Sequence, residues 1–374
     1  MSASREPRVG LVLGAGGVLG AAWLVGALQA IADESGWDPG SAERIVGTSA
    51  GSIIGALVAC GVPPWLMVAH SAGEELDQVS DAAGRPVPGS GHWQGASFRV
   101  HRGLPAIGPG SWRLAAASLA RPYRYSPATV IAGVLPNGPI STEPIKDTVR
   151  SVCPEGWAPH PGLWVVAVDY GSGRRVVFGR PEAPAAELAD AVAASCAIPG
   201  FYRSVRIGEP RYIDGGVRST SNLDVLAGEG LDLVVCLNPT SSLHVSHPRT
   251  LGERMAFALR QASGRRLGAE AAKVRAAGTD VVLIQPTVHD LDTMGTNLMS
   301  RARRHQVIET AVRTVTEHLR ESPVGEQLSR LPAGTPALVR RPAGPPSSWP
   351  DLHTAARARW VPPARTHIRR AGHG

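Results

Sequence analysis

Cysteine is scarce in this chain, and its four cysteines are too widely spaced to form a CxxC pair. This distribution excludes a small disulfide-stapled fold and argues against a cysteine-based zinc site, so we interpret the cysteines as buried thiols in a reducing compartment. The mean hydropathy of −0.03 excludes a protein with many membrane spans. The 43% hydrophobic content excludes a disordered chain, and 374 residues suffice for one large domain or two ordinary ones.

Acidic residues are absent from residues 82–142, which carry six arginines, and a single acid, Asp351, accompanies the seven arginines of residues 339–374. The net charge is +7, so the rest of the chain is slightly acidic. A uniformly basic surface is therefore not expected, and we predict no nucleic-acid partner. Arginines interleaved with Trp and Tyr in residues 82–142 suit peripheral contact with an anionic membrane surface, although a solvated loop explains them equally well.

Charged residues are also missing between Val9 and Ala32, directly after two arginines. A signal peptide or membrane span has this appearance. Six glycines interrupt the run, however, and they cluster where a strand would turn into a helix. We therefore predict a folded strand and helix here, in a cytoplasmic protein.

The first sixty residues read as two strand–turn–helix units. Arg8–Leu13 and Arg44–Val46 predict strands, while Gly20–Ile31 and Ile53–Cys60 predict helices rich in Gly and Ala. This order indicates a parallel α/β sheet.

Further along, regular structure alternates with an irregular region. Residues 84–138 show no periodicity, which suggests a lid or binding loop, and the composition turns to Pro, Arg and Gly after about residue 334. Strands are predicted at Leu163–Val168, Arg175–Phe178, Arg211–Ile213, Leu231–Leu237 and Val281–Ile284, and helices at Ala186–Ala194, Leu251–Ala277 and Met299–Arg320, the last capped by Ser300 or Asn297.

Residues 47–51 read Gly-Thr-Ser-Ala-Gly, which fits the G-x-S-x-G nucleophile elbow. In that turn the serine is strained and exposed at a helix N-terminus, where developing negative charge is stabilised. Side chains at either glycine would collide with backbone. Because glycine-rich chains produce this pentapeptide by chance, the motif alone leaves Ser49 as an ordinary helix N-cap equally open.

A second glycine-rich turn, residues 14–20 (GAGGVLG), presents backbone N–H groups to an anion. The anion could be a nucleotide phosphate or the oxyanion of an acyl-transfer intermediate. A nucleotide-binding loop would place glycine at position 19, where this chain has Leu19. We favour the oxyanion hole, and a nucleotide-binding module remains the alternative.

An activated serine needs a base, and none of the 12 histidines stands in a setting that marks it as one. Asp214 follows a predicted strand and precedes two glycines, so its carboxylate would project from the sheet with little cover. A turn aspartate is the plain alternative. For Asp214 to act as a base, burial must raise its pKa.

Taken together, three motifs resemble the patatin-like phospholipase family. The resemblance covers roughly residues 8–240, and the motifs are specific as a set. Its segments are residues 14–20 (GAGGVLG), 47–51 (GTSAG), 165–178, and 194–217, which includes the DGG of 214–216.

The resemblance implies a Ser–Asp dyad without histidine, in which Ser49 is the nucleophile and Asp214 the general base. It further implies an oxyanion hole formed by the backbone N–H groups of Gly16, Gly17 and Ala50. The other motif glycines are Gly14, Gly20, Gly47, Gly51, Gly215 and Gly216.

The same resemblance implies a three-layer α/β/α sandwich with a mostly parallel sheet, and hydrolysis of acyl esters in lipids without a metal or organic cofactor. We assign residues 1–330 to one acyl hydrolase domain with a lid-like insertion at about 82–142, and residues 331–374 to a disordered tail. The sequence carries no signal for oligomeric state. A catalytically silent protein that binds a membrane surface is the remaining alternative.

The chain departs from the family's usual glycine loop, GGGGxRG, at two positions. Ala15 replaces a glycine, and Leu19 stands where the arginine is expected. Leu19 removes a cation near the site, which would weaken recognition of a phosphate head group.

Overall fold

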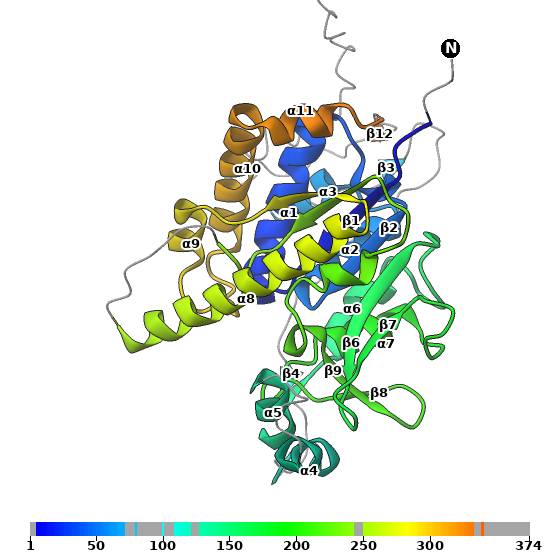
Figure 1. Ribbon diagram of the computed structural model, residues 1–374, viewed down its shortest axis with the longest axis vertical. Coiled ribbons are helices and arrows are strands. Elements are labelled where there is room, and N and C mark those ends of the chain that lie inside the picture. Colours follow the sequence, from blue (N-terminus) through cyan, green and yellow to red (C-terminus); the bar gives the residue numbers. More distant parts are fainter. Residues whose placement is uncertain are drawn as a thin grey trace, which may run out of the picture.

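The computed structural model describes residues 5–71, 79–80, 99–100, 108–120, 127–242, 250–332 and 338–339. In this part of the chain an eight-stranded sheet runs through the centre of the molecule (Figure 1). Its strand order is β11-β10-β1-β2-β6-β9-β8, with β7 paired to β6. The strands are β1 (Val9–Leu13), β2 (Arg44–Thr48), β6 (Leu163–Asp169), β7 (Arg175–Phe178), β8 (Val205–Arg206), β9 (Arg211–Asp214), β10 (Leu233–Leu237) and β11 (Asp280–Ile284).

Five neighbouring strands of this sheet, β11, β10, β1, β2 and β6, are parallel. The sheet becomes antiparallel beyond them, because β7 and β9 both run opposite to β6 and β8 runs opposite to β9. Two short antiparallel pairs lie outside it: β12 (Leu338–Val339) with β3 (Val79–Ser80), and β4 (Arg99–Val100) with β5 (Ile140–Ser141).

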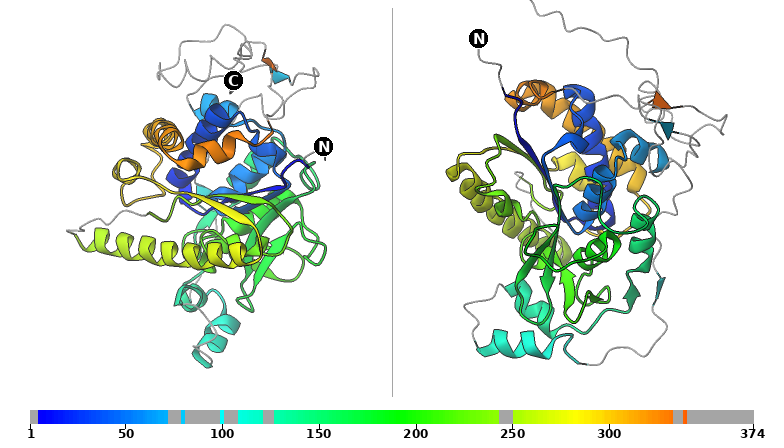
Figure 2. Two further views of the ribbon diagram at one scale, coloured as in Figure 1. Left: turned by 45° about the horizontal axis from the view of Figure 1, so that its top comes forward. Right: turned by 90° about the vertical axis from the view of Figure 1, so that its right-hand side faces the viewer.

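Helices cover both faces of the sheet (Figure 2). One group, which includes α1, α2 and α10, packs together on one face, and the long helix α8 lies across the other. The helices are α1 (Gly17–Ser35), α2 (Ala50–Ala59), α3 (Pro64–Ser71), α4 (Trp112–Ala120), α5 (Pro127–Val134), α6 (Glu143–Arg150), α7 (Leu188–Ser195), α8 (Leu251–Ala276), α9 (Val288–Met294), α10 (Arg304–Glu321) and α11 (Pro323–Ser329), with short 3₁₀ turns η1 (Pro39–Ser41), η3 (Gly215–Val217) and η4 (Leu223–Leu226).

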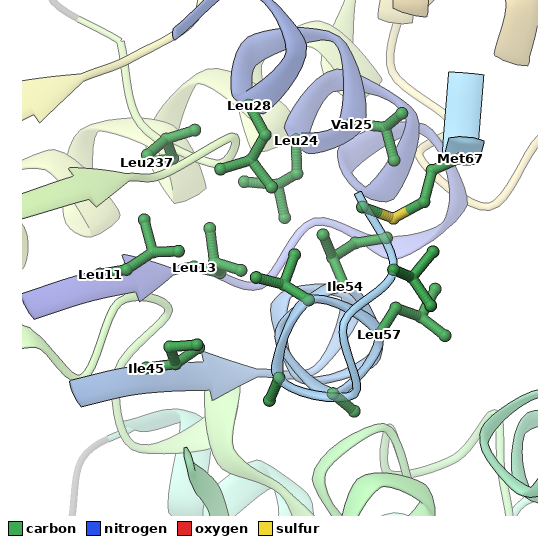
Figure 3. Packing of buried hydrophobic residues seen from close by; sticks show 14 of the residues in the cluster. Leu11, Leu13, Leu24, Val25, Leu28, Ile45, Ile54, Leu57, Met67 and Leu237 are labelled. Carbon is green, nitrogen blue, oxygen red and sulfur yellow. The ribbon is translucent and has the colours of Figure 1, made fainter. Parts of the chain in front are cut away.

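Alternate side chains of each strand supply the two hydrophobic layers. Leu11 and Ile45 point to the face covered by α1, where Leu24 and Leu28 pack against the strands (Figure 3). The intervening residues, such as Val12, join a separate cluster with α8. Because both faces are buried, the central strands are apolar throughout, as parallel strands between helical layers usually are. The prediction of a three-layer α/β/α sandwich with a mostly parallel sheet is confirmed.

The charge-free run from Val9 to Ala32 forms β1, the glycine loop and most of α1, which confirms the predicted strand and helix. Across the described residues, no helix combines the length and hydropathy needed to span a membrane. The other central strands also lie within a few residues of their predicted positions.

The start of the predicted Met299–Arg320 helix is wrong. Helix α10 begins at Arg304, and Arg303 occupies the N-cap position without a capping side chain. Asn297 and Ser300 instead accept hydrogen bonds from the backbone N–H groups of Met299 and Ala302, at 3.1 and 3.4 Å. Both side chains therefore close turns that precede the helix, since these residue types serve turns as readily as helix caps.

The expectation of irregular structure over residues 84–138 is wrong for α4 and α5, which form a helical hairpin at one end of the molecule (Figure 1). Their buried side chains pack on Tyr170 and Ile213, so tertiary contacts supply what two short helices lack on their own. About half of the predicted insertion at 82–142 (residues 82–98, 101–107 and 121–126), and all of the 331–374 tail except Leu331, Pro332 and β12, lie outside the described residues.

Candidate active site

Ser49 sits in a strained turn between β2 and α2. Its backbone has φ 52° and ψ −122°, a region that side-chain-bearing residues rarely occupy. A Cβ on Gly51 would collide with the carbonyl of Leu13, and one on Gly47 would come within 2.5 Å of the Ser52 Cα. The two glycines of the motif are therefore required by close backbone contacts, as the sequence motif predicts.

A buried serine on a neighbouring helix holds this turn. The backbone N–H of Ser49 donates to the Ser195 Oγ at 2.9 Å, and the Ser195 hydroxyl donates to the Val166 carbonyl at 2.6 Å. Ser195 thereby ties the turn to β6. Its neighbour Cys196 borders the same site, but complete burial raises the pKa of its thiol, so it stays protonated.

The strand register brings Asp214 beside Ser49. Thr48, at the end of β2, pairs with Val166 of β6, and the next residue of β6, Ala167, pairs with Asp214 of β9. Ser49 and Asp214 thus flank the same point of β6, although 165 positions separate them in sequence. Both residues are only 4% exposed.

The surroundings of Asp214 make its carboxylate unusually basic. Burial raises the pKa of Asp214 to about 6, while the nearby Ser49 hydroxyl and the Gly216 N–H lower it in part. The Gly216 N–H donates to Asp214 Oδ1 at 2.7 Å. At neutral pH the group is therefore mainly ionised, yet it binds a proton far more readily than an ordinary aspartate.

The glycine loop leaves backbone donors unused next to this pair. The N–H groups of Gly14 and Ala15 donate to the carbonyls of Leu237 and Thr220, at 2.9 and 2.7 Å. Among the described residues, no hydrogen-bond acceptor is found for the N–H groups of Gly16 and Gly17, at the amino-terminal end of α1. A Cβ on Gly216 would come within 3.5 Å of the Ala15 Cβ, so this loop and the Asp214 turn are neighbours.

A third unused donor comes from the other helix of the site. Ala50 is the first residue of α2, and within the described part of the chain its N–H also has no acceptor. Since α1 and α2 both begin here, their partial positive ends reinforce one another. The structure therefore brings together the residues predicted for the site: Ser49, Asp214, Gly16, Gly17, Ala50, and the motif glycines Gly14, Gly20, Gly47, Gly51, Gly215 and Gly216.

Ser49 opens on a cavity of about 280 Å³ between the helices of one face. Its wall is mainly apolar, with side chains from α1, α2, α3, α6 and α10. Val25, Met67 and Leu57, three of the lining residues, lie close together in Figure 3. A hydrocarbon chain would be shielded from water in such a cavity.

Asn222 is a buried residue of the site that the sequence did not single out. Its side-chain N–H₂ donates to the Thr48 hydroxyl at 3.1 Å and to the carbonyls of Gly215 and Ser219, at 3.4 and 2.6 Å. It therefore joins the residue before Ser49 to the residue after Asp214. The signal that could have found it is weak, because an asparagine in a positive-φ turn (φ 51°) is common.

His70 is a second residue that sequence reasoning missed. It lies on α3 and lines the cavity that Ser49 opens on. Of the histidines weighed from sequence, His289 and His305 do not line this cavity, and His244 and His247 lie outside the described residues. The described residues contain no cluster of His, Cys, Asp and Glu that could hold a metal ion.

The candidate site thus combines a serine in a strained turn with an apolar cavity. The family model of the patatin-like phospholipases matches residues 11–227, more than half of the chain. The chain belongs to the patatin-like phospholipase family, and this membership supports lipid acyl hydrolase activity in general.

Among solved structures, the chain is similar to VipD from Legionella pneumophila, with 15% sequence identity and a TM-score of 0.39. The similarity covers 85% of this chain and 67% of that one. The comparison with curated proteins gives no match.

Proposed function

We propose that this protein is a serine lipid acyl hydrolase that cleaves carboxylic esters of lipids, with Ser49 as nucleophile and Asp214 as general base. The observation that carries the proposal is the pairing of a strained serine, at the wall of an apolar cavity, with a buried and basic carboxylate. The pKa of about 6 supports a base that is ionised at neutral pH and still accepts a proton.

In the first half-reaction, Asp214 takes the proton of the Ser49 hydroxyl as the Ser49 Oγ attacks the ester carbonyl carbon. The carbonyl oxygen becomes an oxyanion, which the N–H groups of Gly16, Gly17 and Ala50 stabilise. The intermediate collapses to an acyl-serine, and the departing alcohol takes the proton from Asp214. In the second half-reaction Asp214 activates a water, which releases the fatty acid and restores Ser49.

Substitution and covalent labelling test the nucleophile. We expect Ser49→Ala to lower hydrolysis of a p-nitrophenyl ester by roughly a thousandfold or more, with an unchanged melting temperature. A fluorophosphonate probe should label the wild type but not Ser49→Ala. Ser71→Ala is the matched control, because Ser71 lines the same cavity and its hydroxyl donates to the Met67 carbonyl at 2.9 Å. Labelling that persists in Ser49→Ala contradicts the proposal.

A parallel pair of variants tests the base. Asp214→Asn should abolish most of the activity, whereas His70→Gln should retain it, since the proposal gives the histidine no part in proton transfer. The reverse result, an active Asp214→Asn protein and an inactive His70→Gln protein, would transfer the role of base to His70.

We propose, second, that the hairpin of α4 and α5 contacts an anionic lipid surface. Three of its side chains, Trp112, Ile131 and Val134, are 72%, 57% and 51% exposed, and the exposed Arg113 directly follows Trp112 in α4. Helix α5 contacts η3, which directly follows Asp214, so the hairpin lies close to the candidate active site. Exposed apolar side chains beside a cation suit insertion at a lipid interface.

Vesicle sedimentation tests this contact. Binding should rise with the share of anionic lipid, fall with salt, and weaken when Trp112 and Ile131 are both replaced by Ser. Leu259→Ser is the matched control, because Leu259 is 71% exposed on α8, outside the hairpin. Binding that does not change with lipid charge and salt excludes the contact. A loss of binding in Leu259→Ser as large as that in the double variant excludes it as well.

The nucleotide-binding alternative for residues 14–20 has less support in the structure, because the Gly14 and Ala15 N–H groups already donate to protein carbonyls. Calorimetric titration with ATP, NAD and FAD distinguishes a nucleotide-binding loop from an oxyanion hole. Tight binding without esterase activity would favour a nucleotide.

A further inference from the structure

Arg304 is a cation in the wall of the cavity that holds Ser49. It is the first residue of α10, and it is the one lysine or arginine among the described residues that line this cavity. The other lining side chains are mainly apolar, and the few polar ones, apart from the histidine, are hydroxyl or thiol groups. An arginine in such a wall needs a physical reason, because it places a positive charge beside hydrocarbon.

No partner within the described part of the chain explains this charge. Several other arginines are paired, for example Arg320 with Glu34 at 2.7 Å and Arg175 with Asp224 at 2.5 Å. Arg304 makes no hydrogen bond or ion pair with any described residue, and its side chain is half-buried. Burial and the neighbouring Arg301 both lower the pKa of Arg304, which means that its charge is incompletely compensated.

The position of Arg304 at the start of α10 makes its positive charge still less favourable. The amino-terminal end of a helix carries partial positive charge and favours acidic residues. Helix α10 has none in its first turn, and Arg301, Arg303 and Arg304 gather there instead. Helix α8 shows the stabilising arrangement, a capping box between Thr250 and Glu253. Stability of α10 therefore does not account for the arginines.

The segment that leads to Arg304 is attached to the glycine loop. The Leu19 N–H donates to the Leu298 carbonyl at 3.0 Å, and a Cβ on Gly17 would meet the Met299 Sδ at 2.9 Å. Arg304 follows this attachment by a few residues, and it lines the same cavity as Gly17 and Met299. The loop itself carries Leu19 and offers no cation of its own.

We propose that Arg304 is a specificity-determining residue that binds the phosphate of the lipid ester while the acyl chain occupies the apolar cavity. This inference rests on the proposed hydrolase function. A guanidinium group forms two parallel, charge-assisted hydrogen bonds to a phosphate, which suits recognition of a head group near the scissile ester. The substrate class is then an anionic glycerolipid ester, in preference to a neutral glyceride.

A pair of substrates that differ only in the phosphate tests the assignment. These are decanoyl lysophosphatidic acid and monodecanoylglycerol, both supplied below their aggregation concentrations. We expect Arg304→Gln to lower kcat/KM for the phosphorylated substrate by about 10- to 100-fold, the value of a charge-assisted hydrogen bond, and to leave the neutral substrate within about twofold. Arg304→Lys should recover part of the loss, because it restores the charge without the paired geometry.

Two controls make the outcome specific. Arg301→Gln removes an exposed arginine from the same helix end without touching the cavity wall, and should change neither rate. Inorganic phosphate distinguishes a lipid-bound phosphate from a free one. If inorganic phosphate inhibits the wild type competitively and Arg304→Gln relieves the inhibition, the site binds phosphate by itself. If Arg304→Gln loses the preference for the phosphorylated substrate but inorganic phosphate never inhibits, the site binds phosphate only when it is joined to the acyl chain.

Three results would overturn the inference. They are an equal loss for both substrates in Arg304→Gln, no loss for either, or the same selective loss in Arg301→Gln. Neutral-ester hydrolysis by folded Arg304→Gln shows that the active site is intact. If the wild type hydrolyses neither substrate, or if Ser49→Ala hydrolyses both, the proposed function itself has failed, and the two failures are thus distinguishable.

Discussion

The two faces of the central sheet are built from the same strands and differ in what their helices do. Helix α8 lies along one face, and its buried residues Leu267, Ala271 and Val274 fill the space above Val12 and Val234. On the other face, α1 and α2 begin at glycine-containing turns and do not cover the sheet completely. Their starts leave unused backbone donors and a cavity of about 280 Å³. One face therefore stabilises the sheet, while the other carries the site.

The largest expected effect comes from Asp214→Asn, which changes a residue of the candidate site and should lower activity while it raises stability. Loss of the proposed general base should lower kcat by about a hundred- to ten-thousandfold. The same change should stabilise the fold at pH 8, because an amide is not ionised when buried. Burial raises the pKa of Asp214 to about 6, so the ionised carboxylate weakens folding by about 1–3 kcal/mol.

Chemical unfolding at several pH values measures this effect. With a folded pKa above the unfolded one, the wild type is most stable below pH of about 4 and loses that advantage as pH rises through 6. The stability gain of Asp214→Asn should therefore be full at pH 8 and absent at pH 4. A constant difference across this range would show that Asp214 does not titrate as described.

The rate of hydrolysis by the wild type should depend on the ionisation of Asp214. In the proposed mechanism only the ionised carboxylate accepts the Ser49 proton, so kcat/KM should fall about tenfold for each pH unit below the Asp214 pKa of about 6. The measurement is a pH–rate profile with a substrate that does not ionise. A profile that is flat down to pH 4 would contradict an aspartate base with this pKa.

A pair of leucine substitutions compares packing on the two faces. Leu267 and Leu57 are 1% and 2% exposed, but Leu57 lines the cavity whereas Leu267, a residue of α8, packs in the hydrophobic cluster between that helix and the sheet. We expect Leu267→Ala to cost about 3 kcal/mol of unfolding free energy and Leu57→Ala clearly less, because Leu57 already borders empty space.

Activity should respond in the opposite order. Leu57→Ala enlarges the cavity and should move the optimum of an acyl-chain series to longer esters, while Leu267→Ala leaves the optimum unchanged. Melting curves and rates across that series check both parts. Equal destabilisation with no change in chain preference would mean that acyl chains do not occupy this cavity.

The smallest effect concerns the assignment of residues 1–330 to the hydrolase domain, which stays a proposal. Removal of residues 333–374 takes away β12 but no strand of the eight-stranded sheet and none of the described residues that line the cavity, so esterase activity should change by less than about twofold. Rates of the full and shortened chains give the answer. A large loss would place part of the tail within the functional unit.

Local sequence signals predicted the central strands, helices α1, α2 and α8, and the motifs that carry Ser49 and Asp214. These follow from short-range rules, since apolar runs bounded by glycine predict buried strands and the G-x-S-x-G spacing predicts a tight turn. The start of α10 and the hairpin of α4 and α5 escaped prediction. Turn-forming residues such as Ser300 serve several local structures, and short helices depend on tertiary contacts.

The sequence by itself therefore determined the central strands, the two motifs that carry Ser49 and Asp214, and the family resemblance that rests on those motifs. Tertiary structure alone decided that Asp214 lies beside Ser49, because that proximity depends on the pairing register of β2, β6 and β9. It alone decided the basicity of Asp214, which follows from burial. It also decided the surroundings of Asn222 and Arg304, whose neighbours come from distant segments, since burial and long-range contacts exist only after the chain has folded.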